Sequence, residues 1–248
     1  MGHGAGAILP QRALHLNRGT SRSRATGGPA FSHDSMTPHV PTGLVGLGRG
    51  KMSLVSQLNV SQFSYCLTDI AFYSVSTLTL GGGGGTSANK TARLLDSPQK
   101  LPYSSFYYVN VTGISVGAAL LNLSKEVFQR DGEGRGGMII DSRTALTYLP
   151  QIAFDAILEE AGKQLNVSVE LVYTLQLSIH FDNNATLTVP SQNWLLVDYV
   201  AHKTFLLLDT ISSDSSVPGI LGNILQQNIM VTYDLAHSAL SFEPKHCG

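Results

Sequence analysis

From residue 43 onward, apolar residues come in short runs, most of which alternate with polar residues and end at Gly, Asn, Ser or Asp. Alternation over about four to eight residues is typical of a half-buried β-strand. Residues 107–116 show this pattern best, because they are also rich in β-forming side chains. The other predicted strands are 44–48, 63–67, 76–80, 136–141, 175–181, 185–189, 194–200, 204–209, 229–233 and 239–242, the last two forming a closing hairpin.

One segment has clear helical periodicity. Pro150 precedes a predicted helix at 151–165, and proline suits the first helical turn because its missing N–H would be unpaired there. One face of this helix is expected to carry Ala153, Phe154, Ile157, Leu158, Ala161 and Leu165. A shorter helix of one or two turns is predicted at 53–58, and Trp194 is expected in the core. Many short strands with few helices favour a mostly-β protein.

Two segments lack any periodic pattern. Residues 1–42 are dominated by Gly, Ser, Arg, His and Pro, so we expect them to be disordered or loosely attached. Residues 81–85 are five consecutive glycines, which predict a flexible loop or a hairpin tip.

Composition excludes several classes of function. Charged residues make up 13% of the chain and the net charge is −1, so an electrostatic grip on nucleic acid or anionic lipid is not expected. No apolar run is long enough to span a membrane. Two cysteines and scattered histidines do not make a metal site, and neither a complete phosphate loop nor a Gly-x-Ser-x-Gly elbow is present. We therefore expect no metal and no cofactor.

Asparagine usage points to the secretory pathway. Six of the eleven asparagines stand in Asn-x-Ser/Thr sequons, namely Asn59, Asn89, Asn110, Asn122, Asn166 and Asn184. This excess favours a secreted glycoprotein, although strands rich in Ser and Thr also produce sequons by chance. The first residues, Met-Gly-His-Gly-Ala-Gly, do not form a signal peptide. Two interpretations remain open: a cytosolic chain, or a chain whose true N-terminus lies further upstream.

One acidic residue stands at the end of a buried strand. In Ile139-Ile140-Asp141-Ser142-Arg143-Thr144, the carboxylate leaves an apolar strand into a turn that contains hydroxyl groups. The hydroxyls of Ser142 and Thr144 can donate to this carboxylate or to a neighbouring loop. Further along the chain, Gly219-Ile220-Leu221-Gly222 forms a second apolar strand that ends at glycine.

The turn at residues 141–144 resembles the Asp-Ser/Thr-Gly-Thr turn of pepsin-like aspartic proteases, and the chain is most similar to their plant, nepenthesin-like branch. Further segments follow that branch in order from residue 43 to 248: 43–50, 53–58, 63–67, 107–117, 136–150, 222–223, 226–228, 233–234, Phe242 and 247–248. The resemblance implies a mostly-β, bilobal pepsin-like fold, here a C-terminal lobe plus part of the N-terminal lobe. It divides the chain into an unmatched segment 1–42, an N-lobe remnant 43–100 and a C-terminal lobe 101–248.

The resemblance also implies a function. Pepsin-like enzymes are endopeptidases that hydrolyse polypeptides with two aspartates and no cofactor, and they are secreted or vacuolar and monomeric. Asp141 corresponds to the second aspartate, Ser142 and Thr144 support its turn, and Ile220, Leu221 and Gly222 complete the loop beneath it. Cys66 and Cys247 are implied to form a disulfide, the alternative being two buried free thiols.

Two departures from the family's pattern leave the activity open. No Asp-Ser/Thr-Gly turn stands before residue 43, and Arg143 replaces the glycine of the active turn. We expect a chain that carries half of the catalytic dyad and is inactive by itself. Activity would then need a second chain or a longer one. The alternative is a non-catalytic binding protein on the same scaffold, similar to plant xylanase inhibitors.

Overall fold

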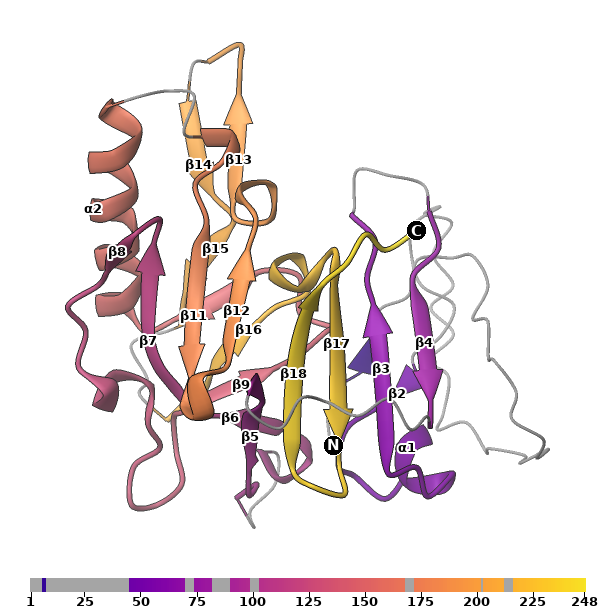
Figure 1. Ribbon diagram of the computed structural model, residues 1–248. Helices are drawn as coiled ribbons and strands as arrows, with labels where there is room; N and C mark the ends of the chain where they lie inside the picture. Colours follow the sequence, from indigo (N-terminus) through magenta and orange to yellow (C-terminus); the bar gives the residue numbers. More distant parts are fainter. Residues whose placement is uncertain are drawn as a thin grey trace, which may run out of the picture.

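Short strands dominate the part of the chain that the computed structural model describes, which comprises residues 6–7, 45–69, 74–81, 90–98, 103–167, 172–201, 203–211 and 216–248 (Figure 1). The strands are β1 (Gly6–Ala7), β2 (Val45–Gly46), β3 (Gln62–Cys66), β4 (Thr77–Leu80), β5 (Ala92–Leu95), β6 (Tyr107–Val109), β7 (Val111–Val116), β8 (Ala119–Leu120), β9 (Met138–Ile140), β10 (Thr147–Leu149), β11 (Leu177–Phe181), β12 (Thr186–Val189), β13 (Leu195–Asp198), β14 (Lys203–Leu206), β15 (Leu208–Thr210), β16 (Gly219–Leu221), β17 (Ile229–Asp234) and β18 (Ala239–Pro244). The helices are α1 (Leu54–Gln57) and α2 (Gln151–Val167), with 3-10 turns at Tyr103–Ser105, Lys125–Phe128, Asp182–Asn184, Ser191–Asn193 and Ile224–Gln226. The mostly-β prediction is confirmed.

Ten strands form one sheet that crosses the whole molecule. Their order is β15-β10-β16-β9-β6-β5-β18-β17-β3-β4. The predicted closing hairpin is the antiparallel pair β17–β18, and β17 also pairs with β3 in the N-terminal part of the chain. In Figure 1 these two strands (yellow) lie between β3 and β4 on one side and the larger C-terminal part on the other. The C-terminal strands therefore join the two parts of the chain into one sheet, as in a bilobal fold.

The predicted strand 107–116 is two strands rather than one. It breaks at Asn110, where the chain leaves the ten-stranded sheet and enters a four-stranded sheet of order β12-β11-β7-β8. Similarly, the predicted strand 204–209 divides into β14, which pairs with β13, and β15, which pairs with β10. In the first segment the alternation continues through the change of sheet, and in the second the apolar run 205–208 is uninterrupted, so the sequence pattern does not mark either boundary.

Helix α2 extends two residues beyond the predicted end and buries a narrower face than expected. Ala153, Ile157 and Ala161 are buried at four-residue spacing. Leu158 was expected on the same face, but its side chain is 51% exposed, so that expectation is wrong. The reason is geometric: Leu158 follows Ile157 by one residue, about 100° around the helix, and falls outside the stripe that contacts the sheets. The short helix α1 confirms the turn predicted at 53–58, with the Ser53 hydroxyl accepting the N–H of Ser56 at 3.1 Å.

Only part of the two aperiodic segments is described. Within residues 1–42, Gly6–Ala7 forms β1 and pairs with β2, so these two residues depart from the unstructured segment that was expected. The rest of 1–42 lies outside the described residues, as do residues 82–85 of the glycine run. Trp194 is fully buried and donates its indole N–H to the Leu175 carbonyl at 3.1 Å, which confirms its core position.

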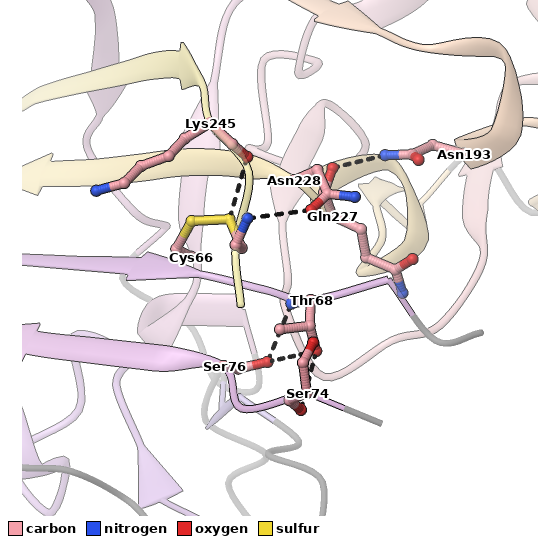
Figure 2. Close-up of a disulfide and its surroundings, with 9 residues drawn as sticks. Cys66, Thr68, Ser74, Ser76, Asn193, Gln227, Asn228 and Lys245 are labelled. Carbon is pink, nitrogen blue, oxygen red and sulfur yellow. Dashed lines mark hydrogen bonds between the residues drawn. A yellow bond between two sulfur atoms is a disulfide. The ribbon is translucent and has the colours of Figure 1, made fainter. Parts of the chain in front are cut away.

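The end of the chain is tied to β3 by a disulfide. Cys66 and Cys247 are bonded, with their Cα atoms 5.4 Å apart, as the family resemblance implied. Asn228 supports this junction, because its backbone N–H donates to the Leu67 carbonyl at 2.8 Å and its side-chain oxygen accepts the Cys247 N–H at 3.2 Å. Figure 2 shows Asn228 beside the disulfide. The covalent link and these hydrogen bonds fix the last residues against the N-terminal strands.

Candidate active site

Asp141 lies directly after β9, in the middle of the ten-stranded sheet, and its side chain is buried. Strand β16 lies parallel to β9, and the Asp141 N–H donates to the Leu221 carbonyl at 3.0 Å. The carboxylate accepts two further hydrogen bonds. Its Oδ1 accepts the backbone N–H of Arg143 at 2.9 Å, and its Oδ2 accepts the Thr144 hydroxyl at 2.9 Å. These bonds hold a buried carboxylate in one orientation.

The turn that carries Asp141 is closed by the segment that follows β16. The Asn223 N–H donates to the Thr144 carbonyl at 2.6 Å, and the Asn223 side-chain amide donates to the Ser142 carbonyl at 2.8 Å. Strand β16 also stands between β9 and β10, the two strands that this turn connects. The turn is therefore locked by a segment about 80 residues away in sequence.

Gly222 lies in close contact with the backbone that leads into β10. Its N–H donates to the buried hydroxyl of Thr147 at 2.9 Å. A Cβ at this position would overlap the backbone carbonyl of Leu146 and stand 2.9 Å from the carbonyl oxygen of Ala145. Only glycine fits here without moving the backbone.

A buried tyrosine cluster lies beside the turn that carries Asp141. The hydroxyl of Tyr65 lies 3.2 Å from that of Tyr233, and the buried Ser142 side chain is near enough to Tyr65 to influence its pKa. Burial is the main cause that raises the pKa of Tyr65 and of Tyr233, and the negative charge of Asp141 adds to both shifts. Burial also raises the pKa of the neighbouring Tyr107 to about 12. These phenols therefore stay protonated at any physiological pH and act as neutral hydrogen-bond donors.

Gln226 connects the tyrosine cluster to the backbone beneath Asp141. Its side-chain oxygen accepts the Tyr65 hydroxyl, and its amide donates to the carbonyls of Leu221 and Gly222 at 2.8 and 3.1 Å. The Leu221 carbonyl is the same group that accepts the Asp141 N–H. A continuous hydrogen-bonded chain thus runs from β3 through Tyr65 and Gln226 to the active turn.

Replacing Tyr65 by phenylalanine should destabilise the protein by about 1–3 kcal/mol, because it leaves the oxygen of the fully buried Gln226 without its donor. Tyr173→Phe is the matched control: its hydroxyl is bonded to that of Tyr199 at 2.7 Å, but both side chains are exposed. Urea unfolding of the two variants measures the difference. Equal midpoints for Tyr65→Phe and Tyr173→Phe would contradict the role given to the buried bond.

The structure brings together the residues that were expected around Asp141. Ser142 and Thr144 belong to its turn, while Ile220, Leu221 and Gly222 lie on the adjacent strand β16 and at its end. Tyr65, Thr147, Asn223 and Gln226 were not assigned a role from sequence. The available signal was weak: polar side chains within or beside apolar runs, which become informative only when burial is known.

The sequons lie mostly on the surface. Asn59, Asn122, Asn166 and Asn184 are exposed and Asn110 is partly buried, whereas Asn89 lies outside the described residues. Within the described ranges, no group of three or more His, Cys, Asp or Glu side chains could hold a metal ion. No described helix is long and apolar enough to cross a bilayer.

Two family models match this chain. A model described as xylanase inhibitor N-terminal covers residues 9–82, and one described as xylanase inhibitor C-terminal covers residues 106–176 and 170–244. The chain belongs to the plant, nepenthesin-like branch of the pepsin-like aspartic proteases. The N-terminal match begins upstream of residue 43, where the predicted remnant of the N-terminal lobe starts.

Relatives within this pepsin-like branch carry protease names. The chain is 36% identical to aspartic proteinase nepenthesin-1 and 37% identical to nepenthesin-2, both from Nepenthes gracilis. Each match covers 83% of this chain and 50% of the relative, so the chain spans about half the length of these proteins. The crystal structure of edgp has the same fold, with a TM-score of 0.67 and 16% identity over 85% of this chain and 61% of that one.

Proposed function

We propose that the turn around Asp141 is the C-terminal half of an aspartic endopeptidase active centre. The observation that carries this proposal is the carboxylate itself: buried at the end of a central strand, held by Arg143 N–H and the Thr144 hydroxyl, and closed from below by the Gly222 loop. Membership of a family whose relatives are named proteases supports it. The substrate class is polypeptides.

The reaction requires a second aspartate. Two carboxylates that face each other share one proton, because like charges so close together cannot both be ionised. The ionised carboxylate takes a proton from a water molecule as it attacks the scissile carbonyl, and the protonated one donates to the carbonyl oxygen. In this chain, Asp141 supplies one of these groups, and its hydrogen bonds from the turn fix the direction in which it faces. The 248-residue sequence contains no Asp-Ser/Thr-Gly string to supply the other.

The alternative function is to bind another protein without cleaving it. Arg143 places a bulky cation where the family has glycine, next to the carboxylate that would meet substrate. The matching family models are described as parts of a xylanase inhibitor. Binding to a xylanase, measured by isothermal titration calorimetry together with inhibition of xylan hydrolysis, would favour this function.

We also propose that the chain is an extracellular or vacuolar glycoprotein and a monomer. The Cys66–Cys247 disulfide suits an oxidising compartment, and four of the predicted sequons are exposed. Mass spectrometry of the secreted protein would measure the occupancy of each sequon.

An acid-proteolysis assay tests the proposed half of the active centre around Asp141, which we call the half-site. At pH 3–5, the purified chain should show no pepstatin-sensitive cleavage of a denatured protein, either as wild type or as Asp141→Ala. Fusing to residue 43 only the part of the nepenthesin-1 N-terminal lobe that precedes the matching position should complete this lobe and restore cleavage. In that fusion Asp141→Ala should reduce the rate by at least about 100-fold, because the chemistry loses an essential acid–base group.

Asp209→Ala is the matched control in the fusion. Asp209 also precedes a threonine at a strand of the same sheet, but its side chain is exposed. This variant should keep full activity. Cleavage by the unfused monomer, or a fusion that cleaves equally well without Asp141, would refute the proposal, whereas binding to xylanase by an uncleaving fusion would favour the alternative.

A further inference from the structure

A second constellation of reactive side chains lies on the polar face of the four-stranded sheet. Ser115 on β7 and His180 on β11 are neighbours across the two strands, and the Ser115 hydroxyl is 2.7 Å from the His180 Nε2. On the other side of the ring, Nδ1 is 3.3 Å from the hydroxyl of Thr186 on β12. A serine, a histidine and a third polar group thus form one line across three adjacent strands.

This line has the arrangement of an activated nucleophile. A hydroxyl becomes nucleophilic when a neighbouring base within about 2.6–3.2 Å takes its proton and a third group orients that base. Partial burial lowers the pKa of His180, which favours the neutral ring that can accept a proton. If Nδ1–H donates to the Thr186 oxygen, Nε2 is left to accept from Ser115, which is the tautomer that the chemistry needs.

A cavity of about 430 Å³ opens beside these residues. Its volume lies in the range of small-molecule sites. Leu120 and Phe181 supply apolar walls, and Asn184 brings a polar side chain to the same space. Opposite His180 in the strand register stands Gly113. A Cβ there would lie 3.9 Å from the imidazole Cδ2 and 3.5 Å from a Leu120 methyl, so the glycine keeps one side of the ring open.

We propose that Ser115 is a nucleophile, activated by His180, that accepts the acyl group of small carboxylic esters bound in this cavity. The Ser115 oxygen attacks the ester carbonyl carbon while its proton passes to His180 Nε2. Collapse of the tetrahedral intermediate breaks the bond to the alcohol oxygen, which leaves with that proton. Water then attacks the acyl-serine, giving its proton to His180, and releases the carboxylic acid as Ser115 regains its proton. Of the residues in this cavity, none belongs to the Asp141 turn, so the activity is independent of the proposed protease function.

Labelling of the intact chain tests this proposal. The protein, treated with an endoglycosidase because Asn184 also belongs to a sequon, is incubated near pH 7.5 with p-nitrophenyl acetate or with a fluorophosphonate probe. Release of p-nitrophenol is followed by absorbance, and the modified peptide is mapped by mass spectrometry. We expect the acetyl and phosphonyl groups on Ser115. Both Ser115→Ala and His180→Gln should slow ester turnover by at least about tenfold, a modest share of what a general base can contribute.

Control variants distinguish the loss of a catalytic group from a disturbed fold. Ser178→Ala removes a hydroxyl directly opposite Ser115 in the register of the same sheet and should leave turnover unchanged. Pepstatin should also leave it unchanged, which distinguishes this site from the protease half-site. Because labelling of the wild type is read directly, the test does not depend on how well the variants fold. Failure of the probe to label Ser115, or turnover that persists in Ser115→Ala, would overturn the proposal.

Discussion

Removing the disulfide should lower the free energy of unfolding by about 5 kcal/mol in the chain-entropy view, and by about 2–5 kcal/mol as native disulfides usually behave. The size of the effect follows from sequence separation. Cys66 and Cys247 are 181 residues apart, so the bond closes a very long loop and removes many conformations from the unfolded chain. Domains are typically stable by only about 5–15 kcal/mol, so this is a large share of the total.

Removing the disulfide should alter the structure of the folded state very little, whereas it increases the conformational entropy of the unfolded state. Asn228, which Figure 2 shows beside the disulfide, still accepts the Cys247 N–H and donates to the Leu67 carbonyl when the bond is absent, so the last residues keep these hydrogen bonds. We therefore expect a Cys66→Ala/Cys247→Ala variant to fold with the native near-ultraviolet spectrum but to unfold at lower urea concentration.

Reductant supplies the control for the disulfide prediction. Dithiothreitol should shift the urea midpoint of the wild type towards that of the double variant and should not move the double variant itself. A wild-type midpoint that reductant leaves unchanged, with complete reduction shown by thiol titration, would contradict the prediction. This comparison uses one sequence in two redox states, so the small voids left by alanine do not enter it.

The strands were predictable where one face of a sheet stays buried along the whole segment. Strand β17 alternates cleanly between buried and partly buried residues, because it remains in the ten-stranded sheet from end to end. The break at Asn110 was not predictable, since the alternation continues while the chain changes sheets. Similarly, Leu158 has helical spacing, but only the packing of α2 decides how wide the buried face is.

The turn that carries Asp141 could be predicted from sequence because its pattern lies within one short segment. An acid after an apolar strand, followed by hydroxyl residues, is a pattern of six consecutive positions that one segment contains completely. The support beneath it is not local. Tyr65 and Gln226 are 161 residues apart, and nothing in either segment indicates that their side chains meet. Such pairs follow from the sheet order, because β17, which pairs with β3, directly follows the Gln226 turn.

Gly222→Ala should destabilise the protein by about 3 kcal/mol or more, at the upper end of what added atoms cost in a packed interior. The new Cβ would overlap the Leu146 carbonyl group and crowd the Ala145 carbonyl oxygen. Both are backbone atoms, and the Ala145 oxygen already accepts the Ile224 N–H at 3.0 Å. The turn can therefore make room only by disturbing backbone hydrogen bonds that close it, such as the one between Ile224 and Ala145.

Gly113→Ala tests whether the cost comes from this contact or from the loss of a buried glycine in general. Gly113 is also buried in a β-rich environment, but its added Cβ would meet its nearest neighbour, a Leu120 methyl, at an ordinary 3.5 Å. We expect a change of no more than about 1 kcal/mol for this variant, because alanine can adopt the backbone conformation of Gly113 without strain. Urea unfolding measures both stabilities, and amide exchange at residues 141–144 should accelerate in Gly222→Ala alone. If Gly222→Ala and Gly113→Ala unfold at the same urea concentration, the closure of the Asp141 turn does not depend on the close approach of Gly222 to the backbone at residues 145–146. The turn around Asp141 would then tolerate a looser loop.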